Sequence, residues 1–192
     1  MLLSTAGEAM RFFEGGQGKR GSSMIICCAY CSLAKERNAL DSISPCEGVT
    51  AIVPVKVKKE KRHGRWETIE KHLLPGYLFL FAEREEQIIE AARKAQIRIL
   101  RYTDETWDLQ GSDRDFACWI YEHGGTVELS KVIRCGDTIK ITEGPLADLQ
   151  GCVTNIDLRR QLVKVKLGIN DFHVWLSFDW AEPITEELGT EQ

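Results

Sequence analysis

Hydrophobic and polar residues alternate in short blocks along the first part of the chain. The run "MIICCAY" at residues 24–30 is apolar and short, which predicts a buried strand. Residues 32–44 follow, with Leu33, Leu40 and Ile43 on roughly one helical face and charges elsewhere, so a helix is expected there. The ordered part of the chain therefore opens with a strand and a helix.

Residues 49–71 predict a strand and an exposed basic hairpin. "VTAIVPVKV" at 49–57 reads as one strand, whose Pro54 suits a sheet edge or a bulge because proline lacks the amide that a sheet ladder needs. Residues 56–71 carry seven basic side chains against three acidic ones, with "HGRW" as the turn. These cations and Trp66 either follow a phosphate backbone or only deter aggregation of an edge hairpin, and composition favours the second interpretation.

Three further elements and a capped helix complete the first domain. "GYLFLFA" at 76–82 predicts a strand, 83–96 a surface helix with acids near its start and bases near its end, and "IRIL" at 97–100 a short strand. Ser112 is placed to cap a helix over 113–123. The prediction is an α+β fold in which helices flank an antiparallel sheet.

From about residue 131 the pattern changes to short β-rich runs. "DTIKIT", "GCVTNID", "LVKVKLG" and "FHVWLSF" are separated by turn residues, which is typical of a small all-β barrel or sandwich. Met24 begins the first ordered run and is an alternative to Met1 as the start of translation. The predicted organisation is a disordered extension at 1–23, an α+β domain at 24–123, a Gly-Gly linker at 124–130, a β domain at 131–184 and a tail at 185–192.

Composition narrows the function classes. A net charge of −4 and a pI near 5.7 argue against nonspecific coating of nucleic acid, because that affinity comes from neutralised phosphates. No run approaches the ~18 apolar residues of a membrane span, and residues 1–23 lack the apolar core of a signal peptide. We therefore expect a cytoplasmic protein, in which seven cysteines, an odd number, fit reduced thiols.

No catalytic centre emerges from the motifs. Cys28 and Cys31 form a C-x-x-C pair, which is open to three interpretations: core packing, a redox pair or half of a metal site. The apolar surroundings favour core packing. The histidines lack metal-ligand spacing, and there is no nucleophile elbow or phosphate loop. We expect no metal, no cofactor and no enzyme activity.

The segment "LLPGYLFLF" at 73–81 places Pro75, Gly76 and Tyr77 directly before an apolar strand. Proline fixes one backbone torsion and glycine permits a conformation that other residues avoid, so the chain can swing from hairpin into strand. Tyr77 then either presents its ring to a protein partner or caps the core, and the residues alone leave both interpretations open.

A second basic group lies in the β-rich part. Lys164 and Lys166 share one strand face because both are even-numbered, and Arg159 and Arg160 precede them. This face either contacts RNA or is simply the solvent-exposed side of a small barrel. The residues alone favour the second interpretation.

Residues 24–184 together resemble the NusG family of transcription elongation factors. The family's N-terminal (NGN) domain is matched by a strand leading into "AYCSLAKERNAL", by "IVP", by the basic hairpin, and by "LLPGYLFLF" against the family's Phe-Pro-Gly-Tyr signature. Its KOW domain, an SH3-like barrel, is matched by "GDTIKITEGPLADLQGCVTNID", with Gly-Asp, Gly-Pro and turn-glycine positions. The two motifs occur in the family's order and separation.

The resemblance implies a monomer that bridges the cleft of bacterial RNA polymerase and modulates pausing and termination. The clamp helices of the polymerase would bind an apolar depression formed by Tyr30, Leu74, Pro75, Gly76 and Tyr77. Nucleic-acid contacts are implied with the non-template DNA strand and with nascent RNA, at Lys35, Arg37, Arg159, Arg160, Lys164 and Lys166.

Departures from the family pattern favour a specialised paralogue, similar to the processive antiterminators LoaP and RfaH, that acts in antitermination of particular operons. Leu74 stands where the family usually has an aromatic residue, and Leu146 and Leu149 replace bulky aromatics of the KOW loop. "LGIND" lacks the aromatic tip that engages Rho or a ribosomal protein, so neither partner is expected. The alternating β-branched runs favour a stable barrel over RfaH-like refolding.

Two rival interpretations come from other classes of protein. One is an RNA- or ribosome-binding module, because KOW domains also occur in ribosomal proteins. The other is a thiol oxidoreductase that uses Cys28 and Cys31.

Overall fold

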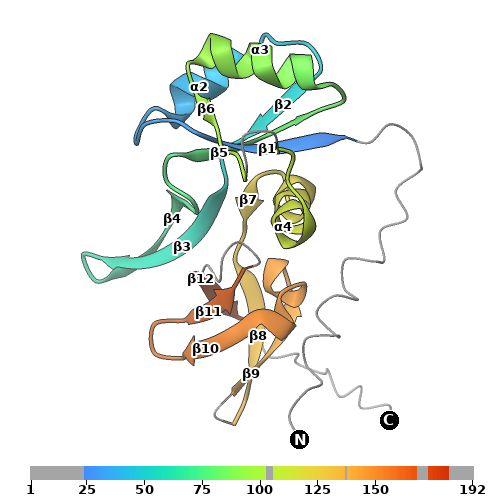
Figure 1. Cartoon of the computed structure of the whole chain (residues 1–192). Helices are drawn as coiled ribbons and strands as arrows, with labels where there is room; N and C mark the ends of the chain where they lie inside the picture. Colours follow the sequence, from blue (N-terminus) through green and yellow to red (C-terminus); the bar gives the residue numbers. More distant parts are fainter. Residues whose placement is uncertain (1–23, 103–105, 137, 168–172, 182–192) are drawn as a thin grey trace, which may run out of the picture.

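A computed structural model describes residues 24–102, 106–136, 138–167 and 173–181, which form a mixed α+β fold as predicted (Figure 1). The predicted extension at 1–23, the tail at 185–192 and most of the "LGIND" loop lie outside the described residues. The strands belong to three sheets, which we call the N-terminal sheet, the hairpin sheet and the C-terminal sheet.

The N-terminal sheet contains the most apolar strand of the chain at its centre. Its order is β2-β5-β1-β6, with β1 at Ile25–Tyr30, β2 at Val49–Ile52, β5 at Tyr77–Ala82 and β6 at Arg98–Ile99. Strand β5 pairs antiparallel with β1, from Ile25 opposite Ala82 to Tyr30 opposite Tyr77, and also with β2. Five of its six residues are buried, because strands cover both its edges and helices both its faces.

Helices cover the two faces of this sheet separately, α2 (Glu36–Ile43) and α3 (Glu85–Ala95) on one and α4 (Gly111–Glu122) on the other (Figure 1). Side chains alternate along β5, so Leu78 and Leu80 join the core beneath α2 and α3. Phe79 and Phe81 join the opposite core, where the Phe79 ring meets Phe116 of α4 edge to face at 5.9 Å.

Two helix starts differ from the sequence prediction. The helix expected over 32–44 begins only at Glu36, because Ala34 has a φ of 62°, a left-handed conformation that breaks a right-handed helix. Ser112 does not cap α4, since the helix begins at Gly111 and Gln110 is its N-cap.

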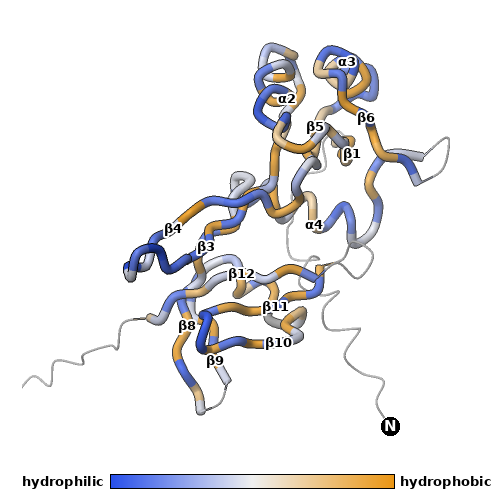
Figure 2. The backbone as a smooth tube through the Cα atoms, turned by 90° about the vertical axis from the view of Figure 1, so that its left-hand side faces the viewer, coloured by the Kyte–Doolittle hydropathy of each residue, from blue (hydrophilic) through white to orange (hydrophobic). Residues whose placement is uncertain are grey.

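The hairpin sheet has the order β4-β3-β7, with β3 at Val55–Arg62, β4 at Arg65–His72 and β7 at Thr126–Val127. The basic hairpin was predicted, and its tip is strongly hydrophilic (Figure 2). The single strand expected over 49–57 was wrong, because the chain leaves the N-terminal sheet at Pro54 and enters the hairpin sheet at Val55. Within the residues predicted as a linker, β7 runs parallel to β3.

The C-terminal sheet has the order β10-β11-β12-β8-β9. Its side chains alternate, so that Val163 and Val165 of β11 and Leu176 of β12 face the core. The four predicted runs all contain strands, and β8 is an additional strand that joins β12 in parallel. The bounds are Ser130–Cys135 for β8, Thr138–Glu143 for β9, Val153–Asp157 for β10, Leu162–Lys166 for β11 and His173–Trp180 for β12, with 3₁₀ turns at Pro145–Ala147 and Gln150–Cys152.

The C-terminal sheet packs against α4 and the hairpin. Buried side chains of α4 and of the C-terminal sheet belong to one continuous apolar cluster. At its edge, Trp119 Nε1 of α4 donates a hydrogen bond of 3.0 Å to Asp148, and Lys59 of β3 forms an ion pair of 2.7 Å with Asp179 of β12. The hairpin therefore lies between the N-terminal and C-terminal sheets.

We expect Phe79→Ala to lower the free energy of unfolding by about 3–5 kcal/mol, because the substitution leaves a cavity in the middle of the most buried strand. Ile89→Ala, on the exposed side of α3, is the control and should change it by less than about 0.5 kcal/mol. Urea denaturation measures both values. Equal effects of the two substitutions would contradict the assigned core.

Candidate functional site

A tight turn lies where the hairpin enters β5. The Tyr77 amide donates to the Leu74 carbonyl at 3.1 Å, and Gly76, the third residue of the turn, has a φ of 83°. These features, with proline in second place, define a type II turn. A Cβ atom at position 76 would also lie 3.0 Å from the Tyr30 ring and 3.1 Å from the Cys31 carbonyl, so both backbone angle and space require glycine.

A buried carboxylate holds this turn against the start of α2. Glu36 is only 3% exposed, and its Oε1 atom accepts hydrogen bonds from the Gly76 amide at 2.8 Å and from His72 Nδ1 at 3.1 Å. The Gly76 carbonyl accepts a hydrogen bond from the Cys31 amide at 2.8 Å, so both backbone polar groups of the glycine are hydrogen-bonded. Sequence reasoning assigned Glu36 to a charged helix face and missed this contact.

The electrostatics of Glu36 favour the ionised carboxylate. Burial alone would raise the pKa of this carboxyl, but the backbone hydrogen bonds to it and the contact with His72 outweigh burial, and the net pKa lies below its ordinary value. The turn is therefore held by a charge-assisted hydrogen bond, which is stronger than one between neutral groups.

The turn displays an apolar patch that we call the Pro-Gly-Tyr surface, formed by Tyr30, Leu33, Leu74, Pro75 and Tyr77. The rings of Tyr30 and Tyr77 are cross-strand partners, 5.3 Å apart and edge to face. Both are half-buried, whereas Leu33 is 65% exposed and lies against Gly76. The structure thus brings together all the residues predicted for polymerase binding and adds Leu33, which sequence reasoning placed on the buried face of a helix.

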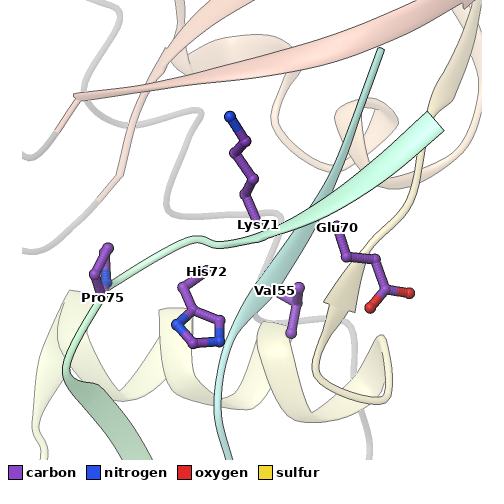
Figure 3. A pocket seen from close by; sticks show the side chains of 5 residues that line it. All are labelled: Val55, Glu70, Lys71, His72 and Pro75. Carbon is purple, nitrogen blue, oxygen red and sulfur yellow. The ribbon is translucent and has the colours of Figure 1, made fainter. Parts of the chain in front are cut away.

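A cavity of about 550 Å³ opens beside this surface at the root of the hairpin (Figure 3). Its described lining residues are Val55, Glu70, Lys71, His72 and Pro75. Lys71 and His72 project in opposite directions from β4 (Figure 3). The lining is therefore mostly polar, and it differs from the aromatic depression that the family resemblance implies.

The first group of predicted nucleic-acid residues borders the Pro-Gly-Tyr surface. Lys35 and Arg37 are exposed and flank the buried Glu36, whose contact with Gly76 places them beside the turn. A partner bound on the Pro-Gly-Tyr surface would therefore have two cations at its edge.

The second group lies on the C-terminal sheet, far below α2 in Figure 1. Arg159 and Arg160 are in the exposed turn between β10 and β11, where Asp157 accepts from the Arg160 amide at 2.9 Å. Lys164 and Lys166 share the outward face of β11, as predicted from their even numbers. The two predicted groups therefore belong to different parts of the molecule.

The cations of the hairpin are largely occupied by acidic partners. Glu60 accepts from Lys58 at 3.0 Å and from Lys71 at 2.7 Å, which lowers its pKa to about 2, and Arg62 lies 3.4 Å from it. Trp66 remains 53% exposed near the tip. These internal pairs support the interpretation of a solvated edge hairpin along most of its length.

The placement of Cys28 and Cys31 agrees with core packing. Cys28 lies against the cluster that contains Phe79, whereas Cys31 belongs to the opposite cluster beneath α2. Burial raises the pKa of the Cys28 thiol to about 12 and also raises the pKa of the Cys31 thiol. Neither thiol is therefore poised to form the reactive thiolate.

The helices in the described ranges are short. There, the longest helix is α4 with 12 residues, and no helix has the length and apolar character needed to cross a bilayer. Within the same ranges, no three His, Cys, Asp or Glu side chains gather in a way that could hold a metal ion.

No protein-family model matches the chain, and no curated protein matches it.

We expect Glu36→Gln to lower stability by about 1–3 kcal/mol at pH 7, because the Gly76 amide and His72 lose a charged acceptor. Since the folded pKa of Glu36 lies below the ordinary 4.5, its contribution is present above about pH 4.5 and is lost as the pH falls through the folded pKa. The difference between wild type and variant in thermal unfolding should therefore shrink below that pH. A difference that grew with acidity would contradict the assignment, and Glu90→Gln on the exposed face of α3 is the control.

We expect iodoacetamide to alkylate the exposed Cys135 well before Cys28 and Cys31 in the folded protein, because burial keeps the latter two thiols protonated and covered. Mass spectrometry of peptides after timed alkylation at pH 7.5 measures the order. Rapid labelling of Cys28 or Cys31 would reopen the redox interpretation, and unfolding in urea should remove the difference.

Proposed function

We propose that the chain is a NusG-type transcription factor that binds bacterial RNA polymerase and modulates pausing and termination on particular operons. In this proposal the N-terminal sheet with its helices and hairpin is an NGN domain, and the C-terminal sheet is a KOW domain of the SH3-like barrel type. The protein acts as a cytoplasmic monomer, without a cofactor and without catalysis of its own.

The observation that carries the proposal is the Pro-Gly-Tyr surface. A type II turn, anchored by a buried carboxylate, holds two tyrosine rings and an exposed leucine in one fixed patch. Preorganised aromatic side chains are the usual anchors of protein interfaces, because little conformational entropy is lost when they bind. The clamp helices of the polymerase are the proposed partner, with the non-template DNA strand near Lys35 and Arg37.

A second candidate function rests on the outward face of β11. Lys164 and Lys166 lie there with Arg159 and Arg160 in the preceding turn, and such a face suits nascent RNA or ribosomal RNA. An RNA- or ribosome-binding module would use this face and would not need the Pro-Gly-Tyr surface. The two candidates differ in what the protein binds. A protein that binds RNA but not polymerase would be the RNA- or ribosome-binding module, and one that binds polymerase but not RNA would be the transcription factor.

We expect Tyr77→Ala to weaken binding to purified bacterial RNA polymerase by about tenfold or more, because it removes a central anchor of the patch. In single-round transcription through a terminator, the wild-type protein should raise read-through and the variant should not. Ile89→Ala, which removes an exposed apolar side chain from α3, is the matched control and should behave as wild type.

Two results would contradict this proposal. One is polymerase binding that Tyr77→Ala leaves unchanged, and the other is an absence of binding by the folded wild-type protein. Tyr77→Phe keeps the ring beside Tyr30 and should retain most of the affinity, which separates a role of the ring from a role of the hydroxyl.

A further inference from the structure

An exposed tryptophan lies on the outward face of the C-terminal sheet. Trp175 of β12 is 38% exposed, and its direct cross-strand partner is Lys164 of β11, whose own partner on β10 is Asn155. The next pair along the same face is Lys166 and His173. An indole, an amine and an amide thus lie side by side on three adjacent strands.

Lys56 of the hairpin contacts this tryptophan, and Lys58 and Lys71 lie near Lys56. Lys56 Nζ donates to the Trp175 carbonyl at 3.1 Å, and Lys58 and Lys71 both reach Glu60 Oε1. Burial, with the nearby charges of Lys58 and Lys71, lowers the pKa of Lys56. Lys58 and Lys71 thus share one carboxylate, and Lys56 lies close enough to feel both of their charges, so an additional anion here would relieve their mutual repulsion.

The hairpin and the C-terminal sheet meet along β12, and Trp175 lies at the rim of this contact. Asp179 is held by Lys59 and Lys131, and Ser177 is buried, whereas Trp175 and His173 on the same outward face are exposed. The ion pair of Lys59 and the hydrogen bond of Lys56 therefore hold the hairpin against β12 at Trp175. We call Lys56, Lys58, Lys71, Lys164 and Trp175 the junction surface.

We propose that the junction surface binds single-stranded nucleic acid, with the Trp175 indole stacked on an unpaired base and the surrounding lysines on the adjacent phosphates. An accessible aromatic ring among cations is the combination by which proteins hold single strands, because every base has a flat face and every linkage a charge. This inference deepens the proposed function and rests on it only for the source of the strand, which is either the nascent transcript or the displaced DNA strand.

The chemistry favours a single strand over a duplex or a protein. Bases of a duplex are stacked on one another and cannot offer a face to Trp175. A protein partner would be expected to meet a more apolar patch with fewer lysines, since lysine is depleted at protein interfaces. Lys164 lies opposite Trp175, Lys56 binds its carbonyl, and Lys71 is the cross-strand partner of Lys56. This series of lysines better matches a strand with regularly spaced phosphates.

Fluorescence anisotropy of the full chain with labelled oligonucleotides tests the proposal. The probes are an oligouridylate RNA and an oligothymidylate DNA of about 12 nucleotides, and a mixed-sequence duplex of similar length. We expect both single strands to bind more tightly than the duplex at about 0.1 M salt. A preference for RNA assigns the transcript as the source, and a preference for DNA assigns the displaced strand.

The variants separate stacking from charge. Trp175→Ala should weaken single-strand binding about 5- to 100-fold, whereas Trp175→Phe should retain most of it because the ring remains. Lys71→Gln should weaken binding and reduce the slope of log affinity against log salt by about 0.7, the value for one phosphate contact. Arg93→Gln removes one cation from α3, on the far side of the N-terminal sheet, and should have no effect (Figure 1).

Three results would overturn the proposal. They are an absence of single-strand binding by the wild-type protein, unchanged binding by Trp175→Ala, and equal losses in Lys71→Gln and Arg93→Gln. Thermal unfolding of each variant shows whether it has folded, and Trp175→Phe remains decisive if Trp175→Ala does not fold. The assay contains no polymerase, so its failure is distinct from failure of the Tyr77→Ala test.

Discussion

The hydrogen bond from the Gly76 amide to the buried Glu36 carboxylate links the parts of the molecule on which the proposed function depends. It joins the start of α2 to the turn between β4 and β5, and His72 at the end of the hairpin shares the same oxygen atom. A buried carboxylate is costly unless it is fully hydrogen-bonded, so the helix, the turn and the hairpin root must be positioned together. The positions of the two tyrosine rings therefore depend on a polar contact beneath them as well as on packing.

The hairpin relates the two proposed surfaces to each other. At its root it enters the Pro-Gly-Tyr turn, and along β3 it is held to the C-terminal sheet by Lys56 and Lys59. The chain can leave the N-terminal sheet to form this hairpin because Pro54 ends the pairing of β2, while its carbonyl accepts from the Leu73 amide at 2.7 Å where the hairpin closes. The hairpin thus contributes to the junction surface and leads directly into the turn that carries the Pro-Gly-Tyr surface.

Local patterns were sufficient for the elements that depend on local periodicity. The apolar strand β5, the basic hairpin, α3 and the strands β9 to β12 follow from composition and turn residues, as does the change of direction at Pro75 and Gly76. The division at Pro54, the pairing of β7 with β3 and the strand β8 were not predictable, because distant partners determine them. Likewise, Glu36 looks like one more charge on a surface helix, and Trp175 like an ordinary strand residue, until the fold places Gly76 and Lys56 beside them.

The acidic net charge is compatible with a nucleic-acid contact because the charges are paired locally. Asp179 and Glu60 are each held by two or more cations, which neutralises part of the charge on the hairpin. The junction surface, which has four lysines and adjoins Glu60, keeps an excess of positive charge. Such a small surface gives weak affinity for a free strand, since affinity scales with the number of phosphates neutralised. Attachment to the polymerase through the Pro-Gly-Tyr surface would raise the effective concentration of the emerging strand, and this tethering allows a weak contact to act only where transcription is under way.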